Sequence, residues 1–525
     1  MSTPNSTIYV CSGVRLTSRY DHSIYFEDEE SQLAYFQRKA VRTFTAYSYI
    51  RKSWKLKLAT TMEQANLWNY LFFQNGENGK WWFYFITNIE YINDGTVELS
   101  LELDVLQTYL FDFNFLPCFI ERQHTISDDI GEHTILENLE LGDYIVNSSE
   151  KAYETYNCCI MVQSTINPNT LANMPGALVD GVYSGLGLYA VNRENWQRLG
   201  AILSGLSSAG KIDAIVNMWM YPKNLVSLED GYDWLDDTVC LPVKGCLTQY
   251  PSFAKNNSDL DGYVPKNNKL FCYPFNFLYV TNNMGTSAVY KYERFNSYAC
   301  NFYLTGAPSP DAGVRIVPQD YNGMTSNYEE GLALGNFPTC SWNADVYKLW
   351  LAQNQNSHNM VEQNATVSFI AGAVTTGVSI ATGGLLGAGA GIGAMYNGLA
   401  SVQSLNAAKS DKAIEPYQAR GGYSTSVNFS MKMHTFLAEQ KSVNKEHAKC
   451  IDDYFTMYGY QVNRIDVPNL DARPAFTFTK TVGCKIQAWF CDEDVKKIQQ
   501  IFDNGVTFWK DGDQIGNYLL NNKPE

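Results

Sequence analysis

Residues 97–105, Val97-Glu98-Leu99-Ser100-Leu101-Glu102-Leu103-Asp104-Val105, alternate apolar and polar side chains without a break. Because successive side chains of a strand point to opposite faces of a sheet, this pattern predicts a half-buried strand with its apolar side chains facing inward. The aromatic run Trp81-Trp82-Phe83-Tyr84-Phe85 precedes it and is also typical of a strand. Asn93-Asp94-Gly95 lies between the two runs and favours a tight turn, so the sequence predicts a hairpin.

Further elements follow from apolar residues at helical spacing and from other strand-like runs. Thr61-Met62-Glu63-Gln64 resembles a capping box and predicts a helix whose apolar face includes Leu67, Trp68, Leu71 and Phe72. The other predicted helices cover residues 342–353, 448–458 before Gly459, and 494–503 before Asn504-Gly505, the last burying Val495, Ile498, Ile501 and Phe502. The other predicted strands cover residues 270–275, 302–304 and 475–482.

The composition favours a β-rich fold with several domains. The chain has 525 residues, which is too long for one compact core, and its hydrophobic fraction of 45% allows large cores. Aromatic residues make up 14%, and Tyr and Phe favour strands. We therefore expect an α+β, β-rich multidomain protein. The expected parts are a β-domain at 1–155, a middle insertion at 156–265, a second β-rich domain at 266–362 that ends in a helix, a hydrophobic loop at 363–415, and a C-terminal part at 416–525.

The charge and the cysteine pattern argue against several classes of protein. The formal net charge of −15 predicts poor binding to nucleic acid, because no counterions would be released from phosphates. An acidic wall would instead let DNA slide past, although net charge also serves solubility. The 12 Cys include no C-x-x-C pair, so we expect reduced, packed thiols rather than a zinc site or a disulfide framework. The segment MSTPNSTIYV lacks the features of a signal peptide.

The sequence offers no recognisable catalytic centre. It contains six His and no H-E-x-x-H, G-x-S-x-G or Walker A motif, and His124 is expected to pack or to form a hydrogen bond. Residues 257–262 imitate the start of a calcium loop, but Asn268 occupies the position that requires Glu, so a polar turn is favoured. The adjacent pairs Asp236-Asp237 and Asp452-Asp453 diverge on any regular element and are predicted to be solvated surface. We expect no enzyme activity, no cofactor and no metal.

Residues 363–408 are the most unusual segment, because they include no charged side chain. The candidates for membrane insertion are its apolar residues, Phe369, Ile370, Val374, Val378, Ile380, Leu385, Leu386, Ile392, Met395 and Tyr396. The segment is also rich in glycine, and four-residue glycine spacing lets helices approach closely in lipid. These glycines are Gly383, Gly387 and Gly391, and the pair Gly389 and Gly393.

Several interpretations of this segment are open. A run of about 20 apolar residues is long enough to span a bilayer as a helix. Glycine costs a helix about 1 kcal/mol per position relative to alanine, so the segment would not hold a stable fold alone in water, whereas lipid would drive it to helix. These tendencies favour a conditional, membrane-active loop over a permanent span. A buried helical hairpin and a flexible linker are the alternatives; the many glycines weigh against the first and the density of apolar side chains against the second.

Several blocks of the sequence resemble the tail knob, or distal tail tube, proteins of small, Picovirinae-type podoviruses. They occur in the order expected for that family and cover both ends of the chain, and the glycine-rich segment lies where the family has one. Between residues 155 and 340 the likeness is limited to general length and Tyr273-Pro274-Phe275. The blocks are residues 103–109, 119–124, 458–464, 468–470, 473–476, 501–509 and 515–518.

The resemblance implies a virion protein whose two chain ends build β-barrel or β-sandwich tube domains. It implies a ring of six copies at the distal tip of the tail, with apolar loops that plug the lumen and then form a membrane channel during genome ejection. The expected partners are further copies of the chain, other tail proteins, the host membrane and phage DNA that passes without specific binding; synthesis takes place in the host cytoplasm. The alternative is a tail-associated hydrolase of cell wall or polysaccharide, which needs two carboxylates about 5–10 Å apart in a groove.

Overall fold

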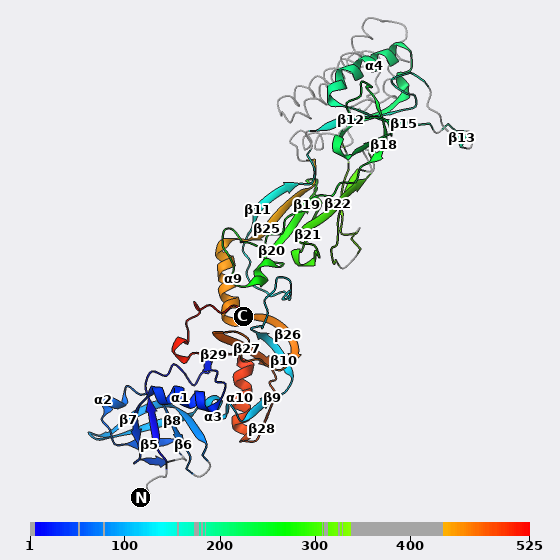
Figure 1. Ribbon diagram of the computed structural model, residues 1–525. Helices are drawn as coiled ribbons and strands as arrows, with labels where there is room; N and C mark the ends of the chain where they lie inside the picture. Colours follow the sequence, from blue (N-terminus) through cyan, green and yellow to red (C-terminus); the bar gives the residue numbers. More distant parts are fainter. Residues whose placement is uncertain are drawn as a thin grey trace, which may run out of the picture. The chain divides into compact units, whose positions relative to one another are not determined.

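The computed structural model in Figure 1 describes residues 6–335, apart from residues 51–52, 77–78, 155–156, 173–177, 180–181, 184, 307, 309–312, 324–325 and 328, together with Phe337 and residues 434–524. The chain divides into two units. Unit 1 consists of Met1–Asp143, Ser258–Phe275 and Val443–Glu525, and unit 2 of Tyr144–Asn257 and Asn276–Ser442. The predicted domain limits after residues 155, 265, 362 and 415 stay a prediction.

Within the described residues, the N-terminal part of unit 1 forms an antiparallel sheet of seven strands. Their order is β3 (Ala40–Phe44), β1 (Ile8–Cys11), β6 (Tyr70–Gln74), β7 (Trp81–Asn93), β8 (Thr96–Leu103), β5 (Lys55–Leu58) and β4 (Ser48–Ile50). The predicted hairpin is confirmed, because β7 and β8 pair with Asn93 opposite Thr96. Val97, Leu99 and Leu101 are buried, as their alternation predicts.

The helix predicted from Thr61 onward is wrong beyond its first turn. Helix α2 spans only Met62–Ala65, and Leu71 and Phe72 belong to strand β6 instead. Both side chains are fully buried, in two different hydrophobic clusters. A central strand between β1 and β7 buries such a continuous apolar run on both faces, and this tertiary gain outweighs the local helical spacing.

A second sheet of unit 1 brings together strands from four of the seven sequence blocks on which the family resemblance rests. The order of its five strands is β2 (His22–Ile24), β29 (Val506–Trp509), β27 (Phe476–Val482), β10 (Cys118–Gln123) and β26 (Tyr460–Asp466). β2 and β29 run parallel, and the other neighbours are antiparallel. A small ribbon of β28 (Ile486–Ala488) and β9 (Phe113–Phe115) lies in the same unit. Segments hundreds of residues apart therefore become neighbours, as the colours of Figure 1 show.

The C-terminal helices follow their sequence patterns closely. α9 (Lys445–Tyr458) ends at Gly459, whose φ of 65° suits glycine, and α10 (Asp492–Asn504) buries Ile498, Ile501 and Phe502 as predicted, while Val495 is half-buried. The predicted strand at 475–482 is confirmed as β27. The remaining helical elements of unit 1 are α1 (Glu29–Lys39), α3 (Val105–Tyr109), η5 (Asn268–Phe271) and η8 (Gly512–Gln514).

Unit 2 is also rich in strands, so the predicted β-rich α+β class is confirmed. One sheet of the described residues has the order β11 (Tyr144–Lys151), β25 (Leu437–Val443), β20 (Asn276–Thr281) and β21 (Ser287–Tyr290), and a second has the order β16 (Ile215–Pro222), β12 (Cys158–Ser164), β15 (Gly187–Val191), β18 (Leu241–Cys246) and β17 (Val226–Leu228). A third sheet has the order β19 (Ser252–Phe253), β22 (Cys300–Gly306), β23 (Val314–Pro318) and β24 (Leu332–Leu334). In addition, β13 (Leu178–Val179) pairs with β14 (Val182–Tyr183). The predicted strand at 302–304 lies in β22. Within the described residues of this unit, the helical elements are α4 (Trp196–Ser208), η2 (Arg193–Asn195), η3 (Ile212–Ala214), η4 (Lys223–Leu225) and η6 (Tyr292–Arg294).

The strand predicted at residues 270–275 is wrong. The chain forms the 3-10 turn η5 and then a cis peptide bond between Tyr273 and Pro274, and strand β20 begins only at Asn276. Proline lacks the N–H that a central strand needs. Leu270, Phe271 and Phe275 are all buried against α9 instead of alternating between two faces.

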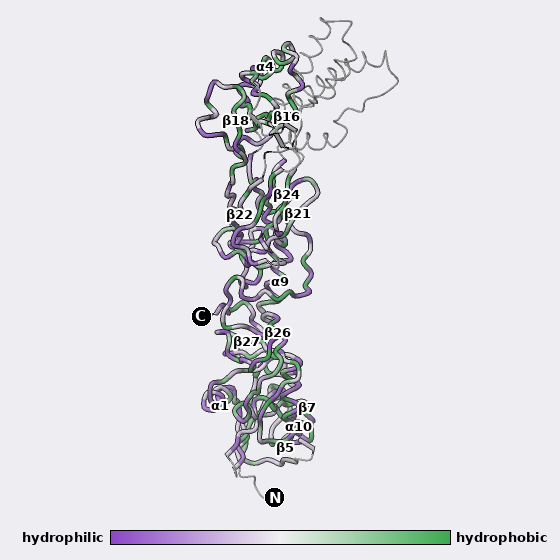
Figure 2. Tube along the Cα trace, turned by 90° about the vertical axis from the view of Figure 1, so that its right-hand side faces the viewer, coloured by the Kyte–Doolittle hydropathy of each residue, from purple (hydrophilic) through white to green (hydrophobic). Residues whose placement is uncertain are grey.

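The predicted helix at 342–353 and the whole segment 363–408, with every candidate membrane-inserting residue and loop glycine, lie outside the described residues. Among the residues that are described, no helix is long and apolar enough to cross a membrane. Figure 2 shows apolar and polar residues interspersed along the described trace of both units. The structure therefore describes the sheets and helices of the two units, and the expected role of residues 363–408 rests on the sequence alone.

Asp104 connects β8 to α3 from a fully buried position. Its carboxylate accepts hydrogen bonds from the Gln107 backbone N–H at 3.1 Å and from the Tyr70 hydroxyl at 2.9 Å. The first bond caps α3, which is why β8 ends two residues earlier than predicted. Burial raises the pKa of Asp104 to about 6.

We predict that Asp104→Asn removes a pH dependence of stability. Asparagine does not ionise; its Oδ1 can still accept from the Gln107 N–H, and its amide N–H can donate to the Tyr70 hydroxyl oxygen. The folded wild type holds the Asp104 proton up to about pH 6, whereas the unfolded chain releases it at about pH 4, so the contribution of this group to the free energy of unfolding falls as the pH rises between them. From pH 4 to pH 7 the variant should gain up to roughly 3 kcal/mol relative to wild type in urea unfolding.

Asp28 provides a control of opposite sign. It is the exposed N-cap of α1, and hydrogen bonds from Ser31 lower the pKa of its carboxyl group. The wild type therefore gains stability at this site as the pH rises through the lowered pKa toward about 4, so Asp28→Asn should lose stability relative to wild type in that lower range and add little pH dependence between pH 4 and pH 7. The interpretation of Asp104 is contradicted if Asp104→Asn differs from wild type by the same amount at pH 4 and pH 7.

Candidate functional site

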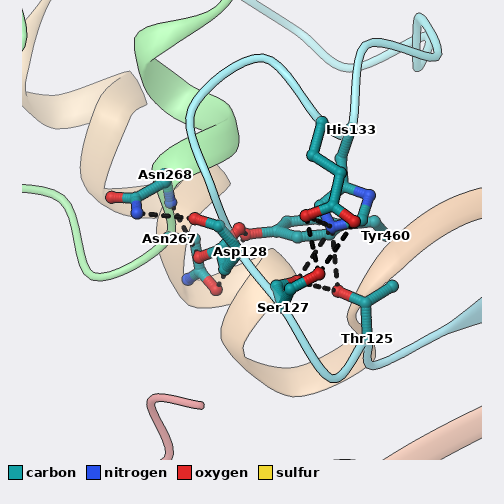
Figure 3. Close-up of polar contacts among 8 residues, drawn as sticks. Thr125, Ser127, Asp128, His133, Asn267, Asn268 and Tyr460 are labelled. Atoms are coloured by element: carbon teal, nitrogen blue, oxygen red, sulfur yellow. Dashed lines mark hydrogen bonds and ion pairs between the residues drawn. The ribbon is translucent and has the colours of Figure 1, made fainter. Parts of the chain in front are cut away.

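A buried polar cluster joins three segments of unit 1 next to the points where the chain passes into unit 2. The first segment is residues 125–141, here called the strap, which follows β10. The second is Ser258–Phe275, and the third is α9 with the start of β26. Three buried carboxylates, Asp128, Glu137 and Asp452, form the cluster with their donors, and Figure 3 shows the part around Asp128.

Asp452 fastens the second segment to α9. Its carboxylate accepts hydrogen bonds from the Tyr263 hydroxyl at 2.7 Å, the Lys266 N–H at 2.8 Å and the Asn267 N–H at 3.0 Å. The Asn267 side chain adds a further bond at 2.8 Å. The prediction that Asp452 lies on a solvated surface is wrong, because these donors come from a segment almost 190 residues away in sequence. Its neighbour Asp453 is more exposed and pairs with Lys266 at 3.6 Å.

Asp128 fastens the strap to both other segments. One carboxylate oxygen accepts from the Asn268 N–H at 3.0 Å, and the other from the Tyr460 hydroxyl at 2.6 Å. The Asn268 side chain also donates to the Asp128 carbonyl oxygen at 2.6 Å. In Figure 3 Asp128 lies between Asn268 and the Tyr460 ring. Burial raises the pKa of Asp128, whereas the Tyr460 hydrogen bond opposes that rise.

Glu137 forms the second anchor of the strap. Its carboxylate makes ion pairs with Arg122 of β10 and Lys269 of η5, and it accepts from the Gln461 N–H at 3.1 Å. Arg122 also donates to the Gly459 carbonyl oxygen at 2.6 Å. The Glu137 and Lys269 side chains are almost completely buried, so the pairing is needed to offset the cost of removing these charges from water.

His124 joins β27 to α9 as a neutral ring. Its Nδ1 accepts from the Phe478 N–H at 2.7 Å, so the proton lies on Nε2, which donates to the Thr456 carbonyl oxygen at 3.2 Å. Burial, aided by the positive charge of Arg473, lowers the pKa of His124 to about 3. The prediction that His124 forms hydrogen bonds is confirmed.

The arrangement is built to hold chain segments together. Each of the three carboxylates receives at least two hydrogen bonds or ion pairs from the protein itself, and buried charge is tolerated when it is paired in this way. Within the part of the chain that the structure describes, no group of three or more His, Cys, Asp or Glu is placed to hold a metal ion.

The sequence did not predict this cluster. Asp128 and Glu137 belong to an irregular segment and Lys269 to the short 3-10 turn η5, and neither helical nor strand periodicity marks a buried residue there. Two of the resemblance blocks, residues 119–124 and 458–464, do supply its walls. Their likeness to a known family was the signal that could have located it.

Comparisons with known proteins agree with this fold. The family model of the C-terminal domain of the Bacillus phage phi29 tail knob protein gp9 matches residues 246–523, and that of the caudoviral major tail protein N-terminus matches residues 4–114. The tail knob proteins gp9 of Bacillus phages phi29 and PZA are 24% and 25% identical over 99% of this chain and 98% of theirs. The solved structure of the bacteriophage C1 tail knob protein gp12 is similar in fold, with a TM-score of 0.64 at 16% identity over 98% of this chain and 99% of that chain.

We predict that Glu137→Ala loosens the strap. The change leaves the buried cations Arg122 and Lys269 without their shared carboxylate, which costs about 3–5 kcal/mol. Thermolysin, which cuts before large apolar residues, should then cleave within residues 125–141 at least tenfold faster, with the cut sites mapped by mass spectrometry.

Glu140→Ala is the matched control, because Glu140 is an exposed residue of the same strap. It should change stability by less than about 0.5 kcal/mol and leave cleavage unaltered. Equal cleavage rates for Glu137→Ala and wild type would refute the anchoring role of Glu137.

Proposed function

Since the chain belongs to the family of the Bacillus phage phi29 tail knob protein gp9, and is thus a structural protein of a phage tail, we propose that it builds the distal tail tube of a short-tailed phage and delivers a membrane-active segment to the host. Six copies form a ring around a lumen. Residues 363–408 plug that lumen in the resting virion and enter the host membrane during genome ejection.

The tube is assigned to unit 1. This unit draws on both ends of the chain, and its five-stranded sheet contains strands from four of the seven blocks on which the family resemblance rests. A ring of such units presents the same sheet in every copy, and a closed ring leaves no subunit with an uncovered side.

The charge of unit 1 suits a passage for DNA. Its three segments contain 34 Asp and Glu against 23 Lys and Arg, so most of the net charge of −15 belongs to this unit. An acidic lining repels phosphates and gains nothing from counterion release, so DNA would pass without being held.

The membrane role is assigned to residues 363–408 from their chemistry. The segment has no charged side chain, combines Ile, Leu, Val and Phe with closely spaced glycines, and falls within the sequence limits of unit 2. In lipid, the glycine spacing would allow close helix packing between copies. The hydrolase alternative gains no support from the cluster, because its buried carboxylates are occupied by donors of the protein itself.

We predict that the chain releases dye from liposomes and that deletion of residues 366–398 abolishes the release. The deletion removes most of the apolar side chains that would enter lipid, while the assembly of unit 1 stays intact. A matched variant replaces the same residues with an equal length of Gly-Ser linker and should also be inactive. Leakage is followed by fluorescence dequenching, and ring formation by electron microscopy of the same samples.

The outcomes separate the two parts of the proposal. Leakage by wild type alone, with rings in all three samples, supports both parts. Equal leakage by the deletion variant rules out the role of residues 363–408. Monomers at every concentration of the wild type rule out the ring.

A further inference from the structure

The chain leaves the described part of unit 2 and returns to it at one place. Phe337 is the last described residue before residues 338–433, and His434 is the first described residue after them. The rings of Phe337 and His434 pack against each other with their centroids 4.8 Å apart. Both residues are almost completely buried, at 2% and 0% exposed. The two ends of residues 338–433 are therefore held side by side in the core of one unit.

Neighbouring residues hold both ends in place, and the group Tyr153, Tyr221, Phe337, His434 and Thr435 is here called the clasp. The ring centroid of Tyr221, in strand β16, lies 4.7 Å from that of Phe337. The Tyr153 hydroxyl donates to the His434 carbonyl oxygen at 3.0 Å, and the Thr435 hydroxyl donates to the Tyr153 carbonyl oxygen at 2.9 Å. Burial lowers the pKa of His434 to about 4, so its ring is neutral near pH 7 and its burial removes no charge from water.

Backbone hydrogen bonds connect the clasp to a sheet. The Ala152 N–H donates to the Phe436 carbonyl oxygen at 2.9 Å. Ala152 directly follows strand β11 and Phe436 directly precedes strand β25, and these two strands are neighbours in one sheet (Figure 1). The Asn283 side-chain amide donates to the Thr435 carbonyl oxygen at 3.2 Å. Opening the clasp would expose buried aromatic rings to water and break these hydrogen bonds, so we expect it to stay closed while unit 2 is folded.

Fixed ends limit how often the intervening chain can cross a bilayer. A chain that leaves one place and returns to it crosses any membrane an even number of times. The flanks of the charge-free segment, residues 338–362 and 409–433, contain charged side chains such as Asp345 and Lys412, which are costly to place in the hydrocarbon core. The crossings therefore fall within residues 363–408, which have room for two helical passages of about 20 residues but not for four.

The sequence of residues 363–408 divides into two such passages. Gly383-Gly384 lies near its middle, and a glycine pair favours a turn. Small residues recur at four-residue spacing in both halves, and this spacing lets two helices approach closely in lipid. These residues are Ala373, Gly377 and Ala381 in the first half and Gly387 and Gly391 in the second.

We propose that the clasp stays closed while residues 363–408 enter the host membrane, so that the segment crosses it as a helical hairpin with both ends on the side of unit 2. This inference rests on the membrane role proposed above and specifies how the segment enters lipid. Only the turn at Gly383-Gly384 reaches the far side of the bilayer. Each copy of the chain then contributes two helices to a channel.

The test places a thrombin recognition sequence in the full chain, at one position per variant. The turn variant has it between Gly383 and Gly384, and the two flank variants have it between Asn356 and Ser357 or between Gln418 and Ala419. In the matched control it precedes Tyr298, which is 96% exposed in unit 2. Each variant is added to dye-loaded liposomes of phosphatidylethanolamine and phosphatidylglycerol. Thrombin is either outside the liposomes, or inside them with a protein inhibitor of thrombin outside.

Thrombin inside the liposomes should cut the turn variant at least tenfold faster than thrombin outside, and only thrombin outside should cut the flank variants and the control. A soluble substrate that stays uncut outside verifies that no active thrombin has escaped. Cleavage of either flank from inside, with the control cut from outside, overturns the inference although the membrane role stands. Cleavage of the turn only from outside, in liposomes that release dye, also overturns it. If wild type releases no dye, the proposed membrane role itself is at fault.

The clasp has a second readout that needs no insertion. Hydrogen–deuterium exchange of residues 150–154 and 434–438 of the unmodified chain should be as slow with liposomes as without them, because the hydrogen bond between Ala152 and Phe436 persists. Faster exchange there in liposomes that release dye would show that the clasp opens, and this result overturns the inference whatever the turn variant does.

Discussion

Unit 1 depends on the burial of three carboxylates, Asp128, Glu137 and Asp452, which hold its separate chain segments together. The strap and Ser258–Phe275 contain little regular structure, so they cannot satisfy their backbone groups by helix or sheet bonds alone. The carboxylates provide the hydrogen-bond acceptors that a neighbouring strand would otherwise provide. They accept the backbone N–H groups of Lys266, Asn267, Asn268 and Gln461, and each hydrogen bond links segments that are distant in sequence.

This construction fits a protein that must stay assembled while one of its segments changes environment. The buried ion pairs between Glu137, Arg122 and Lys269 are costly to break once formed, because a lone partner would remain buried. In the proposed mechanism, unit 1 is therefore the part of the chain that keeps its fold while the ring acts on the membrane. In the proposed mechanism the membrane-active role belongs to residues 363–408, within the sequence limits of unit 2, so the segment can move into lipid without disturbing the anchors of unit 1.

The sequence predicted those elements whose cause is local. The hairpin of β7 and β8 follows from alternation and Asp94-Gly95, and α9 and α10 follow from an apolar stripe and a terminal glycine. The sequence patterns predicted wrongly where residues distant in the chain determine the structure. Leu71 and Phe72 join a central strand, and Asp452 is buried by donors near residue 265. The candidate membrane segment was found from its composition alone, whereas the strap was missed because no periodic pattern marks an irregular, ordered loop.

The central claim is that the two roles belong to different parts of one chain. Hydrogen–deuterium exchange of the assembled protein, measured by mass spectrometry with and without liposomes, tests it most directly. The account predicts that lipid slows exchange in residues 363–408 and leaves the strap, Ser258–Phe275 and α9 unchanged. Slowed exchange in those three segments with no change in 363–408 would contradict it.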